Sequence, residues 1–144
     1  MKYTLSTIID KPIDEVVILF NNQENLYKWM EGLESIDLFE GVAGKKGAKR
    51  RMHFKYGRRE MDMLETIIEN DLPRKMVTTY DAKGVSNIIF TSMESIEGNK
   101  TKYNSTQEFK MHGFMKVVAF LAPKMFKKQT NKILTNFKNF AESN

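Results

Sequence analysis

The chain has 144 residues, a length typical of one domain, so we expect a single domain over residues 1–144 with its own apolar core. It has no cysteine, which excludes disulfides and thiolate metal sites. It also has no apolar N-terminal segment of the secretory type and no apolar run long enough to cross a bilayer, so we expect a cytoplasmic protein. The net charge of +5 is uneven, because residues 1–44 hold three lysines and eight acids whereas residues 45–59 hold eight basic residues and no acid.

The N-terminal part predicts one strand and two short helices. Residues 2–10 alternate between apolar and polar side chains, which is typical of a half-buried strand. Pro12 ends this strand, and the acidic pair Asp14 and Glu15 suits the first turn of a helix, where the helix dipole favours negative charge. A second short helix is expected at about residues 23–30.

Six further strands are expected before residue 111. Turns rich in Gly, Asn and Asp separate them, and Gly57-Arg58 indicates a tight hairpin. Consecutive strands joined by short turns predict an antiparallel meander. The expected strands are 33–40, 49–56, 60–69, 75–80, 85–96 and 101–110.

The apolar period changes from 2 to 3.6 between residue 114 and about residue 142, which predicts a C-terminal helix roughly 40 Å long. Pro123 should kink or split it, since proline has no amide hydrogen and its ring clashes with the preceding turn. Residues 114–122 then either move as a gate over a cavity or belong to a rigid helix with a kink. The apolar stripe contains Phe114, Val118, Leu121, Met125, Ile133, Phe137 and Phe140.

Two short motifs accompany this order of elements. The first is IDKPIDEV at residues 9–16, followed by NLYKWM at residues 25–30, and the second is DLPRKM at residues 71–76. With them the chain resembles the SRPBCC superfamily, also called START-like, which includes birch-pollen-allergen-like proteins and polyketide cyclases or dehydratases. The resemblance implies the α+β helix-grip fold, in which a seven-stranded antiparallel sheet wraps around a long C-terminal helix and two short helices follow the first strand. It covers the whole chain and implies less about function, because the superfamily has no shared catalytic set.

Ten methionines and ten phenylalanines are the main compositional sign of function. Methionine is flexible and suits cavity walls that accept variable apolar ligands, although a single Met more often fills a gap in a core. With the resemblance, this composition predicts a cavity of several hundred Å3 that binds or carries a hydrophobic small molecule, such as a lipid, quinone, polyketide or aromatic. We expect it to be lined by Trp29, Met52, Phe54, Tyr56, Met63, Glu65, Ile67, Tyr80, Tyr103, Gln107, Phe109, Phe114, Val118, Leu121 and Met125.

Glu65 is the one candidate catalytic residue. It alternates with Met63 and Ile67, so it should point inward with them, and a desolvated carboxylate among apolar side chains could anchor a ligand or carry a proton. A bulge that turns Glu65 outward, or a salt bridge to Arg50, would give it a structural role instead. The tyrosines and Gln107 could orient a ligand's oxygen or satisfy one another. An enzyme of the polyketide cyclase or aromatase type, with Glu65 or a tyrosine as proton carrier, is therefore the alternative to a binding protein.

No cofactor, nucleotide or nucleophile motif is present. The two histidines, His53 and His112, are too few for a metal cluster without help from carboxylates, so we expect no metal. His53 should be exposed on a basic strand face, and His112 should serve a turn. The basic block 45–59 predicts a solvated strand face and a turn, which could bind nucleic acid weakly through charge but not specifically.

The start of the predicted C-terminal helix is apolar nearly all round, and residues 110–144 contain seven lysines and one glutamate. This surface could make transient contact with an anionic membrane or form a homodimer interface. Alternatively, neighbouring loops cover it. The sequence leaves these three interpretations open.

Overall fold

The computed structural model describes the whole chain, residues 1–144. Seven strands and five helical segments follow one another in the order that the sequence predicts. In chain order they are β1 (Lys2–Ile9), α1 (Ile13–Asn21), the 3-10 turn η1 (Gln23–Asn25), α2 (Leu26–Trp29), β2 (Leu33–Glu40), β3 (Lys49–Tyr56), β4 (Arg59–Asp71), β5 (Lys75–Ala82), β6 (Val85–Ile96), β7 (Lys100–Met111), α3 (Phe114–Leu121) and α4 (Pro123–Glu142).

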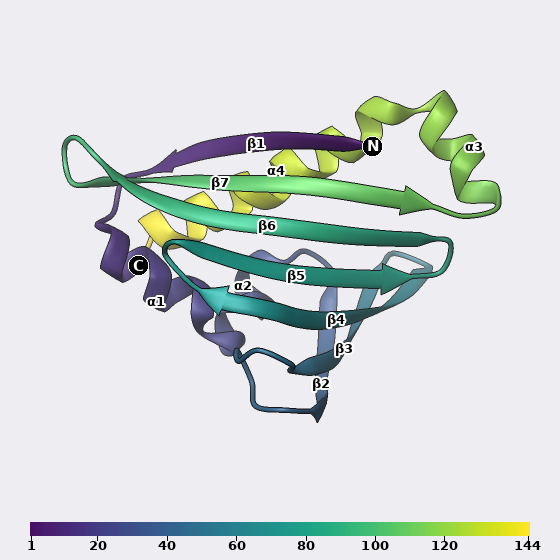
Figure 1. The fold of residues 1–144 in the computed structure, drawn as a ribbon, viewed down its shortest axis with the longest axis horizontal. Helices are drawn as coiled ribbons and strands as arrows, with labels where there is room; N and C mark the ends of the chain where they lie inside the picture. The colour runs from purple at the N-terminus through teal and green to yellow at the C-terminus, as the bar shows by residue number, and fades with distance from the viewer.

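All seven strands form one sheet in the order β1-β7-β6-β5-β4-β3-β2, and every neighbouring pair is antiparallel. Figure 1 shows the strands side by side in a curved layer, with α4 crossing behind them and its C-terminal end beside α1. The short helical segments after β1 and the C-terminal helix on the sheet confirm the predicted helix-grip fold. None of the helices is both long and apolar enough to cross a bilayer.

The apolar core lies where the C-terminal half of α4 meets the sheet and α2. Phe137 is fully buried, and its ring packs edge-on against Trp29 and Tyr103 at centroid distances of 5.0 and 5.6 Å. Leu134 and Ala141, about one turn away on either side, are buried as well, as helical spacing requires for one face. Since α4 packs mainly along β1, it leaves space between itself and the middle strands of the sheet.

The predicted C-terminal helix is split into two. The chain breaks at Ala122 (φ −135°, ψ 57°), and Pro123 begins α4 at a position where its missing amide hydrogen removes no helical hydrogen bond. As a result α3 lies beyond the end of β7 instead of across the sheet (Figure 1). The prediction that Pro123 kinks or splits the helix is confirmed, but the apolar stripe is not buried at its first members, since Phe114 and Leu121 are 77% and 73% exposed.

Candidate functional site

A cavity of about 500 Å3 lies between the sheet and α4, and 20 of its 36 lining residues are hydrophobic. Alternate residues of β4 reach it, as strand geometry requires: Met61, Met63, Glu65 and Ile67. Helix α4 supplies the facing wall with Phe126, Gln129, Thr130, Ile133 and Leu134. The predicted cavity of several hundred Å3 is thus confirmed in size and in its mainly apolar lining.

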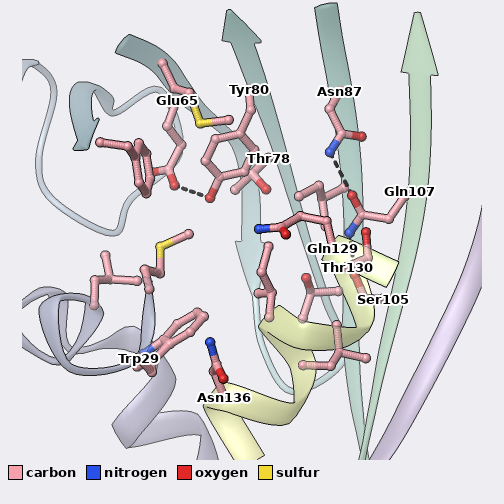
Figure 2. A pocket seen from close by; sticks show the side chains of 18 of the residues that line it. Trp29, Glu65, Thr78, Tyr80, Asn87, Ser105, Gln107, Gln129, Thr130 and Asn136 are labelled. Carbon is pink, nitrogen blue, oxygen red and sulfur yellow. Dashed lines mark hydrogen bonds between the residues drawn. The ribbon is translucent and has the colours of Figure 1, made fainter. Parts of the chain in front are cut away.

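Three polar side chains form a row across β3, β4 and β5 inside this cavity. The strand register places Arg50 opposite Glu65 and Glu65 opposite Tyr80. Arg50 donates to both carboxylate oxygens of Glu65, from Nε at 2.6 Å and from Nη2 at 3.2 Å. The Tyr80 hydroxyl donates to the same carboxylate (Figure 2). Because Glu65 is only 1% exposed, this bidentate pair compensates a buried charge.

Glu65 combines two of the roles that its sequence position left open. It faces the cavity, and it also forms the salt bridge to Arg50. The bulge in β4 lies further along, between Ile67 and Glu69, so it does not turn Glu65 outward. Burial raises the pKa of Tyr80 well above its ordinary value, and the negative charge of Glu65 raises it further. This phenol therefore stays protonated and acts as a hydrogen-bond donor.

A second polar group lies on β6 and β7. The Asn87 amide donates to Gln107 Oε1 at 2.7 Å, and the Gln107 amide donates to Ser105 Oγ at 2.7 Å. Figure 2 shows Asn87, Gln107 and Ser105 on one side of the cavity, with Glu65 and Tyr80 on the other. Asn87 Oδ1 is buried and has no hydrogen-bond partner within the protein. A buried acceptor of this kind is costly unless it is paired, so it suits a donor group on a ligand.

Most of the residues predicted to line the cavity do so. Ten of the fifteen border it: Trp29, Phe54, Tyr56, Met63, Glu65, Ile67, Tyr80, Tyr103, Gln107 and Phe109. Tyr103, Ser105, Gln107 and Phe109 alternate along β7 on one face, and all four reach the cavity.

Five predicted lining residues lie elsewhere. Met52 shares a strand face with Phe54, but it is fully buried in the apolar core instead of bordering the cavity. Three of the others follow from the split at Ala122, which carries the helix start away from the sheet: Phe114, Val118 and Leu121. Met125 lies in the first turn of α4 and is half exposed.

The sequence analysis missed several lining residues. Arg50 was left with two assignments, the solvated basic block and a salt bridge to Glu65. Its alternation with Met52 and Phe54 favours the second, which the structure confirms. Asn87 lies between the lining residues Val85 and Ile89 on the same face of β6, which gives the same signal. Gln129 and Thr130 had no such signal, because the axis of α4 depends on where the helix breaks.

The histidines lie outside the cavity. His53 Nδ1 is 2.7 Å from Asp62 Oδ1, and its Nε2 is 3.4 Å from Glu60 and 3.7 Å from Glu34. The hydrogen bond to Asp62 raises the pKa of His53 above 6.5. Glu34, His53 and Glu60 offer ligand atoms within 4.8 Å of one another, but both carboxylates are exposed. His112 joins the turn after β7, where its backbone amide donates to Gly84.

No protein-family model and no curated protein sequence matches this chain. Solved structures do match it along nearly its whole length. Ara h 8.0201 superposes with a TM-score of 0.80 at 15% identity, covering 100% of this chain and 99% of that one. The Zhui aromatase/cyclase of a Streptomyces species gives a TM-score of 0.81 at 11% identity, covering 99% and 93% of the two chains. TTHA0849 from Thermus thermophilus gives 0.78 at 14% identity, covering 99% and 98%. The chain therefore shares the helix-grip fold of these solved structures.

Proposed function

We propose that this protein binds or carries a hydrophobic small molecule in the cavity between the sheet and α4. The observation that carries the proposal is the cavity itself, whose volume of about 500 Å3 and mainly apolar lining match ordinary small-molecule sites. A lipid, quinone, polyketide or aromatic compound has the matching chemistry. The shared fold of an aromatase/cyclase supports this only at the level of fold.

The polar groups of the cavity favour a ligand that carries oxygen or nitrogen at its edge. A hydroxyl or amide donor on the ligand would pair with Asn87 Oδ1, which has no partner in the protein. The Tyr80 oxygen donates its hydrogen to Glu65 and keeps its lone pairs for a second donor. The apolar body of the ligand would lie along the methionines of β4.

Native mass spectrometry of protein purified from its own host tests the proposal directly, by the mass of a co-purifying lipid or aromatic. Binding of N-phenylnaphthylamine, a neutral apolar dye, gives a second measurement. Met63→Trp fills the cavity and should weaken dye binding about tenfold or more, which corresponds to roughly 1.4 kcal/mol. Ile68→Trp adds the same ring on the other face of β4, where Ile68 is exposed, and should leave dye affinity unchanged. Equal dye affinity in both variants would contradict binding in the cavity.

An enzyme of the cyclase or dehydratase type is the second candidate, and the Arg50–Glu65–Tyr80 row is the observation that favours it. Ionisable groups inside an apolar cavity are typical of active sites. Against it, both oxygens of Glu65 already accept hydrogen bonds from Arg50, so neither is free of a partner when a substrate arrives. Binding without turnover therefore has more support.

The two candidates differ in what they release. A dehydratase or aromatase would release a product lighter by one or more water molecules than the ligand it was given, and a cyclase that only closes a ring would release an isomer of equal mass and different chromatographic retention. Tyr80→Phe removes the phenolic proton and should leave the released mass unchanged if the protein only binds. If wild-type protein releases a dehydrated product and Tyr80→Phe releases the intact compound, the enzyme assignment is correct.

A further inference from the structure

Helix α3 carries apolar side chains on the face that points away from the protein. At helical spacing Phe114, Val117 and Leu121 share one face with Phe120 beside them, and their exposed fractions are 77%, 48%, 73% and 84%. Met115, on the opposite face, lies against the β5–β6 turn. No residue of α3 is buried. A surface helix ordinarily presents polar side chains to water, so α3 is apolar on the side where it should be polar.

Positive charge surrounds this apolar face. Residues 109–141 contain seven lysines and no acid. The ion pairs of this segment use only Lys132 and Lys138. Four other lysines lie just before α3, within it or in the first two turns of α4, and are exposed: Lys110, Lys116, Lys124 and Lys128. The combination of unpaired ammonium groups and exposed aromatic rings is the chemistry of an interfacial helix.

We infer that α3 and these four lysines dock on the surface of an anionic lipid bilayer. The apolar face enters the headgroup region, and the ammonium groups meet lipid phosphates. With eight residues α3 is roughly 12 Å long, well short of the hydrocarbon thickness, so it lies in the plane of the interface. Charge favours the bilayer over a second copy of the chain, because a twofold contact through α3 would bring the same lysines against each other.

The docking surface adjoins one end of the ligand cavity. Val85 and Phe109 line that end, and Met115 of α3 lies against the turn at Gly84, directly before Val85. A docked protein would therefore hold this end of the cavity at the bilayer, which suits a ligand that partitions into membranes. This docking rests on the proposed function only for its purpose, because the evidence for it is α3 and not the ligand. Membrane docking can therefore be disproved while ligand binding holds, and the reverse is also true.

Vesicle flotation tests the docking. Wild-type protein should float with vesicles of phosphatidylcholine containing roughly one quarter phosphatidylglycerol, and binding should fall with added salt. Pure phosphatidylcholine vesicles should bind it at least about tenfold more weakly, since each lysine near an anionic surface contributes about a fivefold factor. The double variant Phe120→Ser, Leu121→Ser should lose binding, as should Lys116→Glu with Lys124→Glu. All four side chains are exposed, so the variants should unfold at the wild-type temperature.

Two matched controls distinguish docking through α3 from non-specific adsorption to the vesicles. Ile18 of α1 is 69% exposed, and Ile18→Ser removes an apolar side chain elsewhere without affecting flotation. Lys45→Glu with Lys46→Glu removes the same charge from the basic turn and should also leave binding intact. Failure of wild-type protein to bind anionic vesicles overturns the inference, as does equal loss in the controls. A wild-type dimer that Phe120→Ser, Leu121→Ser converts to a monomer, without vesicle binding, would assign the surface to self-association instead.

Discussion

Glu31 and Lys132 form an ion pair, with 2.5 Å between Glu31 Oε2 and Lys132 Nζ, that joins the segment after α2 to helix α4. Both residues line the cavity, and both side chains are 54% exposed. A pair that borders the cavity and also contacts solvent lies at the cavity's rim. It therefore joins α4 to the α2 segment at the rim of the cavity.

Breaking this ion pair should speed ligand exchange without much loss of stability. Exposed ion pairs contribute only about 0–1 kcal/mol to folding, so the free energy of unfolding of Lys132→Met should be close to that of the wild-type protein. The rate of dye release, measured by stopped-flow competition, should rise several-fold. Lys49→Met breaks the exposed pair with Glu40, away from the cavity, and serves as the control. Equal release rates in both variants would show that the Glu31 pair does not restrict passage.

Removing Arg50 should destabilise the protein severely. Arg50→Met leaves Glu65 buried without its charge partner, which typically costs about 3–5 kcal/mol. Urea unfolding measures this loss. Arg51→Met, at the exposed neighbouring position, should change the unfolding free energy by less than about 0.5 kcal/mol. The double variant Arg50→Met, Glu65→Leu should be more stable than Arg50→Met alone, and a double variant that is less stable would contradict the assignment.

His53 should make stability depend on pH near neutrality. Its pKa is raised in the folded protein by the hydrogen bond to Asp62, so protonated His53 favours the folded state. That contribution is present in full below pH 6.5 and is lost as the pH rises through the raised pKa. Asp62→Asn should lower the pKa of His53, as measured by proton NMR titration, and flatten the pH dependence. An unchanged titration in Asp62→Asn would show that Asp62 is not the cause.

Nucleic-acid binding by residues 45–59 should be weak and lost with salt. Arg50 is turned inward onto Glu65, and Lys49 pairs with Glu40 at 3.7 Å, so the block presents less positive charge than its composition indicates. Charge-only binding falls steeply with salt concentration. Gel shifts with two unrelated duplexes should give equal, salt-sensitive affinities. A tight, sequence-dependent shift at physiological salt would refute this prediction.

Backbone amides of α3 should exchange with solvent faster than those of α4. No residue of α3 is buried, whereas Thr130, Leu134, Phe137 and Ala141 anchor α4 in the core. Hydrogen–deuterium exchange of ligand-free protein should therefore label residues 114–121 well before residues 130–140. Equal protection of the two segments would mean that α3 does not move independently.

The alternation of the sequence predicts most of the fold, because strands expose and bury side chains with a fixed period of two. Strand 85–96 and the turn at Gly57-Arg58 were placed correctly on this basis. Ten lining residues follow from the same period. Met52 shows the limit of this period. The period tells which face of the sheet a side chain lies on, but not whether the side chain packs in the core or borders the cavity on that face.

The errors in α3 have another cause. Helical spacing relates the direction of Phe114 to that of Phe137 only if the axis between them is continuous. The backbone angles of Ala122 end that continuity, and the direction taken by α3 then depends on contacts that no sequence period encodes. Arg50 kept two assignments at the sequence level, because its run of basic residues predicts a solvated face whereas a salt bridge to Glu65 predicts an inward one.

The row formed by Arg50, Glu65 and Tyr80 also bears on how the sheet finds its alignment. If β4 slipped by one residue against β3, Arg50 would lie opposite Leu64 or Thr66, and the carboxylate would move to the other face of the sheet. An apolar neighbour tolerates such a shift far better than a buried guanidinium does. Misaligned pairings of β3, β4 and β5 are therefore penalised by an unmatched charge in an apolar interior. The same three side chains that shape one wall of the cavity thus select the strand pairing that creates it.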